Sequence, residues 1–347
     1  MSTNEKYMRR CVELAQLGAG NVSPNPMVGA VIVFNDQIIG EGYHRKYGES
    51  HAEVHAINAV QNKESLKHST IFVSLEPCAH YGKTPPCAEL IIKSEIPRVV
   101  IGSIDPFAKV AGKGIEMLRA HGVDVIVGVE KDLCDELNRS FFTFHRLKRP
   151  HIILKWAQTL DGFIDRDRSN PELGLPTWIS NEHSRTLVHK QRTEVDAILI
   201  GTNTAFKDNP SLTVRDWSGK QPLRLVIDKN NRLPENLNIK SGDAQTIIFT
   251  NVQANDSELV QYVRLNFNQN IIPQMLQWMF QHDIQSVVVE GGNVLLSSFI
   301  AANQWDEAHV YIGNNWFGAG VKAPQITQHS ALTETIDDTL LKVFKNN

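Results

Sequence analysis

A histidine, a glutamate and two cysteines near the start of the chain have the types and the order of a catalytic metal site. His51 and Glu53 stand two residues apart, and Cys78 and Cys87 follow further along the chain. Imidazole nitrogen and thiolate sulfur are good Zn²⁺ ligands, and a catalytic zinc site keeps three protein ligands and one open position. We therefore predict that His51, Cys78 and Cys87 bind Zn²⁺, which ionises a bound water near neutral pH.

Glu53 decides between a catalytic and a structural metal site. The order His-x-Glu and then Pro-Cys is typical of zinc deaminases of bases and nucleosides, in which the glutamate is the general acid/base and not a ligand. A closed structural site needs a fourth ligand, for which His80 is the candidate, and two plain core cysteines are the other alternative. The presence of Glu53 favours catalysis and predicts that this carboxylate transfers a proton.

Size and composition describe an ordinary globular protein of about two domains. The chain has 347 residues, a net charge of -3 at pH 7 and four cysteines. This charge gives no reason to expect nucleic-acid binding, and the cysteines do not suggest a disulfide framework. Residues 1–10 lack the apolar core of a signal peptide, and no apolar stretch approaches the length of a membrane span. We expect a cytoplasmic protein that binds neither nucleic acid nor membrane.

The first half of the chain is predicted to alternate strands and helices. An amphipathic helix is expected from Tyr7 to Ala15. Such alternation predicts an α/β sandwich with helices on both faces of a sheet. The other expected strands are 28–34, 37–41, 70–75, 99–103 and 123–127, and the other expected helices are 51–60, one beginning at Cys87, 112–121 and 132–145.

These elements must bring the metal ligands to one point. Two residues on a regular helix point about 200° apart, so His51 is expected at the very start of its helix, where it can face the same centre as Glu53. Cys78 follows the end of a strand. Cys87 comes directly after Pro85-Pro86, which suits a helix start, and the helix dipole there is expected to lower the pKa of its thiol.

Two loops are expected near a substrate. Asn25 lies between two prolines and offers both a donor and an acceptor, which suits the edge of a base, although a plain proline-rich turn is the alternative. Residues 43–48 are rich in cations and aromatic side chains. This loop either holds a phosphorylated sugar or forms a solvated turn.

The first half resembles the deaminase half of the bifunctional riboflavin-biosynthesis deaminase/reductase family. The similar runs are SPNPMVGAVIV, GYHRKYGESHAEVHA and EPCAHYGKTPPC, the last of which contains the long Cys-to-Cys insert of that family. The resemblance implies a cytidine-deaminase-like α/β/α sandwich. It also implies contacts to the deaminase substrate by Asn25, His44, His80, Lys83 and Asp105.

A polar break ending in Pro150 marks the expected domain boundary, with a deaminase domain over 1–147 and a second domain over 151–347. A loop is expected over 165–177 and a small-residue turn over 201–204. The strands expected in the second domain are 151–157, 197–200, 223–227, 246–249 and 286–289, and the helices are 181–192 and 272–282.

The segment Glu290-Gly291-Gly292 joins a predicted strand to a predicted helix. Bare glycines let the backbone approach a phosphate, and a helix N-terminus offers free N–H groups to an anion. The dinucleotide-binding GxGxxG fingerprint is absent from this segment. From the residues alone, a phosphate site and a tight structural turn are about equally supported.

The second half resembles the reductase half of the same family, whose fold is similar to dihydrofolate reductase, in the runs KWAQTLDGFI, WIS, GTNTAFKDNPSLTVR and VVVEGG. The resemblance implies that NADPH is the cofactor, that Lys155 and Glu290 lie nearest the reducing centre, and that the loop before Trp178, with Pro176, departs from the family. It implies substrate contacts by Arg192, Leu212, Arg215 and Glu290, the arginines being suited to a phosphate. The implied cofactor residues are Ala157, Trp178, Thr204, Asp208, Gly292, Asn293, Val294, Leu295, Leu296, Ser297 and Ser298.

The resemblance implies two reactions in sequence. The first is hydrolytic deamination of 2,5-diamino-6-ribosylamino-4(3H)-pyrimidinone 5′-phosphate. The second is NADPH-dependent reduction of the ribosyl chain of 5-amino-6-(5-phosphoribosylamino)uracil to ribityl. Small phosphorylated pyrimidines are then the partners, and a homo-oligomer, dimer or tetramer, is expected.

Three alternatives remain open at this stage. A nucleic-acid editing zinc deaminase with an accessory binding domain would share the metal pattern but predicts a basic surface and aromatic stacking platforms. A non-enzymatic, zinc-stabilised interaction protein is disfavoured by Glu53. The third alternative is an enzyme with one decayed domain, which would more readily be the reductase because the zinc ligands and Glu53 are all present.

Overall fold

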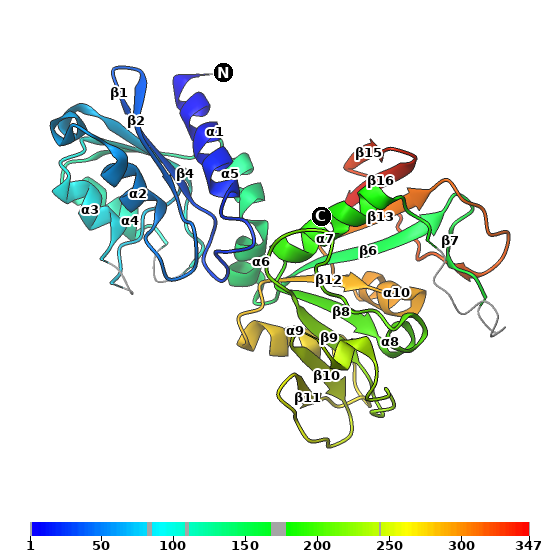
Figure 1. Ribbon diagram of the computed structural model, residues 1–347. Helices are drawn as coiled ribbons and strands as arrows, with labels where there is room; N and C mark the ends of the chain where they lie inside the picture. The colour runs from blue at the N-terminus through cyan, green and yellow to red at the C-terminus, as the bar shows by residue number, and fades with distance from the viewer. Residues whose placement is uncertain (1, 82–84, 108–110, 168–177, 243, 347) are drawn as a thin grey trace. The chain divides into compact units, whose positions relative to one another are not determined.

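The computed structural model describes residues 2–81, 85–107, 111–167, 178–242 and 244–346. The chain divides into two compact units, Met1–Lys148 and Arg149–Asn347. Each unit alternates strands and helices (Figure 1), so the predicted α/β class is confirmed. Within the described residues, no helix is both long enough and apolar enough to span a bilayer.

The first unit contains a sheet with the strand order β2-β1-β3-β4-β5. β1 runs antiparallel to both of its neighbours, whereas β3, β4 and β5 are parallel. Every residue of β1 except the last is buried, as expected for a strand covered on both faces. The strands are β1 (Gly29–Phe34), β2 (Gln37–Tyr43), β3 (Thr70–Leu75), β4 (Arg98–Ser103) and β5 (Asp124–Val127).

Helices cover both faces of this sheet, which makes it the predicted α/β/α sandwich (Figure 1). Successive side chains of a strand point to opposite faces. Ala30 and Ile32 of β1 therefore pack with α2, α3 and α4, while Val31 and Val33 pack with α1 and α5. The helices are α1 (Thr3–Gln16), α2 (Ala52–Ala59), α3 (Cys87–Lys93), α4 (Lys113–Ala120), α5 (Lys131–Leu137) and α6 (Arg139–Leu147), with a short 3-10 helix η1 (Lys63–His68).

The prediction of one helix over 132–145 was wrong, because α5 and α6 are separate helices that meet at Asn138. The backbone of Asn138 leaves helical geometry, with φ -109° and ψ 25°. Its buried side chain accepts the N–H of Met27 and donates to the C=O of Met27, both at 2.8 Å. The break therefore fastens the proline-rich loop that carries Asn25 to the helical layer.

Gly42 lets β2 and α2 approach to backbone contact. A Cβ atom at this position would lie 2.5 Å from both Ala52 O and Ala56 N. Only glycine avoids that overlap. This close approach fixes the depth of α2 against the sheet, and α2 carries Glu53 in its first turn.

The second unit contains a longer sheet with the strand order β11-β10-β9-β8-β12-β6-β13-β16-β15. From β11 to β13 all neighbours are parallel, and β16 and β15 add antiparallel strands at one edge. β7 (Phe163–Asp165) and β14 (Val321–Lys322) pair separately. The strands of the large sheet are β6 (His151–Thr159), β8 (Ala197–Gly201), β9 (Leu223–Ile227), β10 (Thr246–Thr250), β11 (Val260–Arg264), β12 (Ser286–Glu290), β13 (Glu307–Gly313), β15 (Leu332–Ile336) and β16 (Thr339–Lys345).

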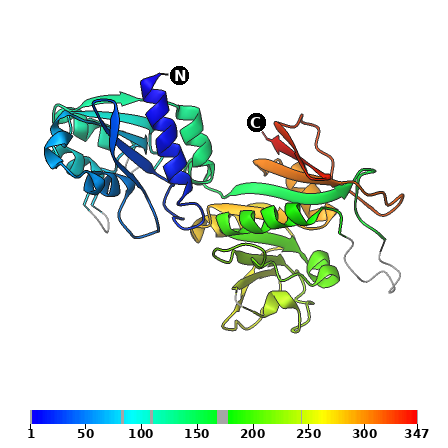
Figure 2. The same ribbon diagram turned by 45° about the horizontal axis from the view of Figure 1, so that its top comes forward.

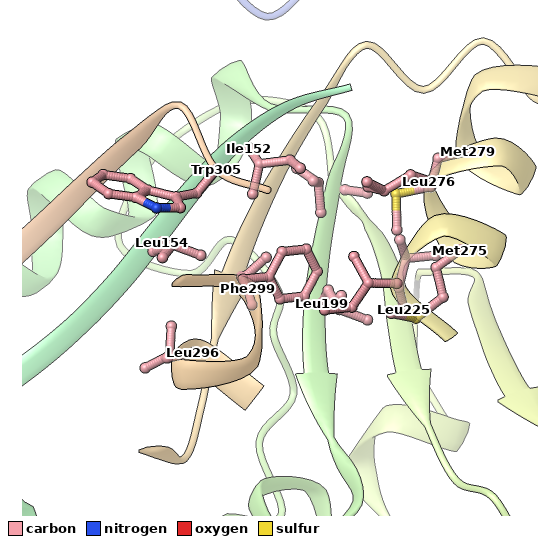
Figure 3. Close-up of a cluster of buried hydrophobic side chains, with 14 of the residues drawn as sticks. Ile152, Leu154, Leu199, Leu225, Met275, Leu276, Met279, Leu296, Phe299 and Trp305 are labelled. Atoms are coloured by element: carbon pink, nitrogen blue, oxygen red, sulfur yellow. The ribbon is translucent and has the colours of Figure 1, made fainter. Parts of the chain in front are cut away.

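The main core of this unit lies between one face of the sheet and two helices, α9 (Ile271–Gln281) and α10 (Asn293–Ala301). Figure 3 shows Ile152 and Leu199 from the strands meeting Met275 of α9 and Phe299 of α10. The opposite face carries α7 (Glu182–Glu194) over β6 and β13; Figure 2 shows this helix lying along the sheet. Alternate residues of β6 and β12 therefore face α7 and can build a site there.

The turn predicted over 201–204 was wrong, since Gly201 is the last residue of β8 and a short helix α8 (Thr202–Asp208) begins directly after it. A second short element, the 3-10 helix η3, covers Asn238–Lys240. α8 lies at the carboxyl end of β8, whereas η3 lies beside the amino-terminal ends of β9 and β10, where Arg224 donates to the C=O of Asn238 and Thr246 to the C=O of Ile239. Ligands of open α/β sheets bind at the carboxyl ends of parallel strands.

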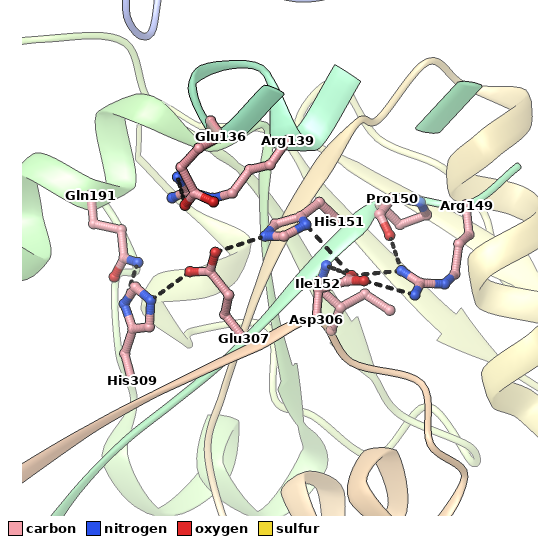
Figure 4. Close-up of polar contacts among 10 residues, drawn as sticks. All are labelled: Glu136, Arg139, Arg149, Pro150, His151, Ile152, Gln191, Asp306, Glu307 and His309. Carbon is pink, nitrogen blue, oxygen red and sulfur yellow. Dashed lines mark hydrogen bonds and ion pairs between the residues drawn. The ribbon is translucent and has the colours of Figure 1, made fainter. Parts of the chain in front are cut away.

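A polar network joins the beginning of β6 to the beginning of β13 (Figure 4). Arg149 donates to both carboxylate oxygens of Asp306, at 2.6 and 2.8 Å, and Asp306 also accepts the N–H of Ile152 at 2.7 Å. Glu307 lies between His151, at 3.6 Å, and His309, at 2.9 Å. These contacts stabilise the amino-terminal ends of β6 and β13. The residues expected to react lie towards the carboxyl ends of the strands.

Candidate active sites

His51, Cys78 and Cys87 lie together in the first unit, with their ligand atoms all within 4.8 Å of one another. His51 Nδ1 lies 3.6 Å from Cys78 Sγ and 3.3 Å from Cys87 Sγ. In the described parts of the chain this is the only group of His, Cys, Asp and Glu that is close enough to hold a metal ion. His80 is exposed and is not part of the group, so these residues do not form a closed four-ligand site.

Local backbone geometry places the three side chains. His51 is the N-cap of α2, with φ -75° and ψ 167°, so it precedes the helix as predicted and its side chain can face the same centre as Glu53. Cys78 follows the end of β3 by three residues. Cys87 is the first residue of α3 and Pro86 is its N-cap, so the cysteine and not the proline takes the first helical position.

The two neighbouring thiols shift each other's pKa in opposite directions, so the lowered pKa that was expected at Cys87 is found at Cys78 instead. Cys78 Sγ interacts with the Cys87 thiol, accepts the Cys87 backbone N–H at 3.3 Å and lies near His51; these interactions lower the Cys78 pKa to about 4. The neighbouring Cys78, together with burial, raises the Cys87 pKa instead of lowering it. A thiolate at Cys78 beside the imidazole is the state that a cation would bind.

Glu53 stands beside these ligands and is nearly inaccessible, at 3% exposure. Its Oε2 atom has no hydrogen-bond partner within the described residues. Burial raises the Glu53 pKa and outweighs the opposing effect of His51. One imidazole, two thiols and an unsatisfied carboxylate oxygen next to them fit a Zn²⁺ ion with a water molecule in reach of Glu53.

Asn25 and His44 lie at the same site and are joined to each other. His44 Nδ1 lies 3.1 Å from the C=O of Ser50, which can only accept, so Nδ1 carries the proton and Nε2 accepts from the Asn25 amide at 3.1 Å. The His44 ring is edge-on to the His51 ring at 5.4 Å. Burial lowers the pKa of His44, which keeps it neutral. These two hydrogen bonds, from Ser50 through His44, orient the Asn25 amide.

Asp105 is also close to the site, whereas Lys83 lies outside the described residues. Burial, and secondarily the charge of Glu76, raise the pKa of Asp105 to about 6. Glu76 itself accepts the N–H groups of Gly112, at 3.0 Å, and Gly114, at 2.9 Å. No role for Glu76 was predicted beyond its place before Cys78, but this buried carboxylate also accepts the N–H of Asp105 and so ties Asp105 to the start of α4.

In the second unit, Lys155 and Glu290 are direct neighbours on the parallel strands β6 and β12. Both belong to the alternating set that faces α7. Arg192 of that helix lies 3.3 Å from Glu290 Oε2 and also donates to the C=O of Thr213 at 3.0 Å. The Lys155 ammonium lies 5.7 Å from the centre of the Tyr311 ring. The predicted polar groups of the reductase therefore meet in one place.

The charges of this cluster shift one another. Burial lowers the pKa of Lys155, and the attraction of Glu290 offsets this only in part. For Glu290, burial acts upwards, but Lys155 and Arg192 outweigh it and hold its pKa below the ordinary value. A lysine that releases its proton more readily than usual, beside an ionised carboxylate, is suited to proton transfer.

Arg215 and Leu212 lie on the segment that follows α8. Leu212 is buried and has a positive φ of 56°. Arg215 lines a polar cavity of 240 Å³ together with Ser211, Thr213 and Arg224. The backbone N–H of Arg215 donates to His189 of α7 at 2.9 Å. His189 was not among the predicted site residues.

The predicted cofactor residues gather at the carboxyl ends of β12 and β8. Gly292 is the N-cap of α10, and its N–H donates to Thr204 Oγ1 of α8 at 3.0 Å. Gly291 has φ 134°, a conformation that only glycine adopts readily. Val294 is 81% exposed, whereas Leu296 is fully buried in the main core, so its side chain cannot meet a ligand.

The other predicted cofactor residues differ in their exposure and in their hydrogen bonds. Asn293 accepts from Ser297, and Ser298 donates to the C=O of Val294. The side chains of Leu295 and Ala157 are half-buried, and Asp208 is the last residue of α8. Trp178 is exposed, with the Arg185 guanidinium 4.5 Å from the centre of its ring. Pro176 and most of the 165–177 loop lie outside the described residues.

Family models match both units of the chain. A model described as "RibD C-terminal domain" matches residues 150–345. A model described as "Cytidine and deoxycytidylate deaminase zinc-binding region" matches residues 1–103, which contain the His51, Cys78 and Cys87 cluster.

Known proteins are similar over almost the whole chain. The riboflavin biosynthesis protein RibD of Bacillus amyloliquefaciens is 42% identical over 93% of this chain and 87% of that protein. The Escherichia coli K12 protein of the same name is 35% identical over 92% and 90%. A diaminohydroxyphosphoribosylaminopyrimidine deaminase/5-amino-6-(5-phosphoribosylamino)uracil reductase from Thermotoga maritima superimposes with a TM-score of 0.89 at 35% identity, covering 99% of both chains. Acinetobacter baumannii RibD gives a TM-score of 0.88 at 30% identity, also over 99% of both.

Proposed function

Since the chain belongs to the family of the riboflavin biosynthesis protein RibD, we propose an assignment of its residues to the two reactions of that family. The protein is a bifunctional enzyme of riboflavin biosynthesis, a deaminase and a reductase. The nucleic-acid editing alternative is not favoured. The observation that carries the deaminase assignment is the His51, Cys78 and Cys87 cluster with the unsatisfied Oε2 of Glu53 beside it.

The first unit deaminates 2,5-diamino-6-ribosylamino-4(3H)-pyrimidinone 5′-phosphate in this proposal. His51, Cys78 and Cys87 would hold Zn²⁺, which when bound acidifies a water molecule and acts as a Lewis acid. Glu53 Oε2 takes the proton of the attacking water and returns a proton to the departing amine. The raised Glu53 pKa suits both steps, because a base that also donates needs a pKa nearer to neutral.

The remaining groups of the first unit bind and orient the pyrimidine. The Asn25 amide, fixed by His44, presents its oxygen to an N–H of the base. Asp105 lies on the loop held by Glu76 and contacts the same substrate, and Lys83 and His80 belong to the insert between the two cysteines.

The second unit reduces the ribosyl chain of 5-amino-6-(5-phosphoribosylamino)uracil in this proposal, with NADPH supplying the hydride when bound. The residues that would border the cofactor at the strand ends are Gly292 to Leu295, Ser297, Ser298, Thr204, Asp208, Ala157 and Trp178, while the buried Leu296 packs in the core beneath them. Lys155 gives a proton to the sugar as its ring opens, and Glu290 holds the ammonium and the sugar hydroxyls in place. Arg192, Leu212 and Arg215 contact the substrate, and the cation of Arg215 suits its phosphate.

One pair of assays tests this assignment. Purified enzyme given the diamino substrate is expected to release ammonia, and enzyme given the deaminated intermediate is expected to oxidise NADPH faster than NADH. Ammonia release without any oxidation of either nicotinamide would overturn the reductase half alone. We also propose a homo-oligomer, a dimer or tetramer, to be measured by light scattering, and a cytoplasmic location, since reduced thiol ligands need a reducing compartment.

A further inference from the structure

His189 is a buried histidine of α7 that neither proposed reaction uses. It is 5% exposed. Its Nδ1 accepts the backbone N–H of Arg215 at 2.9 Å and that of Asp216, more weakly, at 3.4 Å. A backbone N–H can only donate, so Nδ1 must carry a lone pair and the ring proton must be on Nε2. Asp216 Oδ2 lies 3.5 Å from Nε2, on the side of that proton. The contacts therefore require the neutral imidazole.

Side chains bind the backbone of each residue from Thr213 to Asp216 by hydrogen bonds. Arg192 donates to the C=O of Thr213 at 3.0 Å. Gln221 accepts the N–H of Val214 at 2.7 Å and donates to its C=O at 3.3 Å. His189 holds the next two residues, Arg215 and Asp216. The exposed Arg215 side chain thus projects from a backbone that is held by two side chains of α7, Arg192 and His189, and by Gln221 just before β9.

We propose that His189 is a positioning residue of the reductase: as a neutral imidazole it fixes the backbone at Arg215 so that the guanidinium meets the phosphate of the substrate, and a proton on Nδ1 releases that segment. The proposal rests on the proposed reductase function and on the assignment of Arg215 to the phosphate. Protonated histidine has two N–H donors, so the Arg215 N–H would face another donor in place of an acceptor.

The charged groups around His189 favour the neutral form. Arg192 comes from α7 itself, Arg215 and Asp216 from the held segment, and Glu290 from the end of β12. Burial is the largest effect, and with the two arginines it lowers the His189 pKa below 6.5, against the opposing effect of Asp216 and Glu290. The segment is therefore held at neutral pH and is released as the solution becomes acidic.

Steady-state kinetics of the intact enzyme on the deaminated intermediate with NADPH, from about pH 5 to pH 8, test the proposal. In the wild type, KM is expected to rise about tenfold towards the acidic end with kcat changed less than about twofold. His189→Asn keeps an amide oxygen near the position of Nδ1 and does not titrate, so its KM should lack this rise. His189→Leu removes the acceptor and should show a KM about tenfold higher at every pH.

A change in KM could also come from titration of the substrate or from misfolding of a variant, and two controls exclude these causes. The phosphate of the substrate titrates near pH 6, but it does so equally in all three proteins, so the wild-type KM is read as a ratio to that of His189→Asn. Ammonia release and zinc content in the other unit show that the variants are folded. A KM that rises in His189→Asn in parallel with the wild type would overturn the proposal.

Hydrogen exchange at the Arg215 and Asp216 amides gives a second measurement that does not depend on turnover. At one pH, His189→Leu should exchange these amides faster than the wild type, and His189→Asn should restore most of the protection. Unchanged exchange in His189→Leu would overturn the proposal, whereas an enzyme that oxidises no nicotinamide cofactor contradicts the proposed function and leaves this readout intact. If Arg215→Gln has the wild-type KM, Arg215 does not contact the phosphate, and the proposal for His189 is overturned.

Discussion

Glu53 shows at the residue scale how burial creates reactivity. Its carboxylate is packed inside the first unit, yet one oxygen has no partner in the described structure. An unsatisfied buried oxygen is costly and is retained where chemistry needs it. The same logic applies to Lys155, whose pKa is lowered mainly by burial.

Replacing Glu53 with glutamine should remove proton transfer and leave the metal ligands in place. We expect Glu53→Gln to slow ammonia release by about 10²- to 10⁴-fold. Zinc content and NADPH oxidation on the deaminated intermediate should stay at the wild-type level. Glu49→Gln, an exposed carboxylate before the same helix, is the matched control and should be nearly silent. Loss of zinc in Glu53→Gln would mean that this carboxylate is a ligand.

Lys155→Met should impair the reductase reaction and spare the deaminase reaction, the reverse of Glu53→Gln. The substitution keeps most of the side-chain length and removes the ammonium that faces Glu290, so reduction of the deaminated intermediate should fall by about 100-fold or more. Ammonia release should be unaffected. Lys190→Met, on the exposed side of α7, serves as the control. A normal reductase rate in Lys155→Met would disprove the proton-transfer role.

Asp105 links pH to stability. Its folded-state pKa of about 6 lies above the unfolded value of 3.8, so the folded state binds the proton more tightly. The native state therefore loses stability as the pH rises from 3.8 to about 6, and the full cost is present above that window. Asp105→Asn cannot ionise and should gain about 1–3 kcal/mol of unfolding free energy relative to wild type at pH 8, and much less at pH 4. Urea unfolding at both pH values measures this, and an equal gain at both would refute it.

Single residues were predictable from sequence where chemistry demands a type and a spacing. The set His51, Cys78 and Cys87 could be chosen because few residue types bind zinc, and the structure brings these three together. Glu76 and His189 could not be found that way. Each acts by accepting backbone N–H groups from residues 26 or more positions away, and no local pattern encodes such a contact.

At the scale of elements, the junction between α5 and α6 links stability to the deaminase site. Asn138→Ala would leave the N–H and C=O of Met27 without their side-chain partner. We expect a loss of about 1–3 kcal/mol in the urea unfolding free energy of the first unit. We also expect a higher KM for the diamino substrate, because the loop carrying Asn25 is no longer fixed.

Asn138→Asp is the informative comparison for this junction. It keeps the acceptor for the Met27 N–H but sets a buried carboxylate oxygen against the Met27 C=O, so at neutral pH its unfolding free energy should be at least as low as that of Asn138→Ala. If Asn138→Ala unfolds at the wild-type urea concentration, the junction does not fasten the loop.

The elements most readily predicted were those with continuous apolar runs. β3 and β9 have the predicted bounds, Thr70–Leu75 and Leu223–Ile227, because most of their residues are apolar, although β9 also buries Arg224. The strands that were not predicted are β7, β11, β13, β14, β15 and β16. β15 lies at the edge of the sheet with most of its side chains exposed, so its sequence carries no apolar pattern, and β11, at the other edge, alternates only weakly.

At the scale of the whole molecule, each unit has its own hydrophobic clusters. Those built on β1, β3 and β4 draw only on the first unit, and those built on β6, β8 and β12 only on the second. Among the described residues, no hydrophobic cluster contains side chains from both units. A change confined to one unit, such as loss of its metal ion, should therefore leave the activity of the other unit intact.

Metal removal tests this independence. Treatment of the whole enzyme with a strong zinc chelator should abolish ammonia release and leave NADPH oxidation on the deaminated intermediate within about twofold of the untreated rate. Added Zn²⁺ should restore the first activity. Parallel loss of both activities would show that the second unit depends on the metal, in contradiction to the separate cores.

The position of β6 has a consequence for how the protein is made. This strand opens the second unit, yet both of its neighbours, β12 and β13, are synthesised more than 120 residues later. A newly emerged β6 has no strand to pair with until nearly the entire polypeptide has left the ribosome, and long-range parallel pairing is slow. The deaminase portion can mature while translation continues, whereas the reductase portion must wait, exposed to chaperones and proteases, for the final stretch of the message.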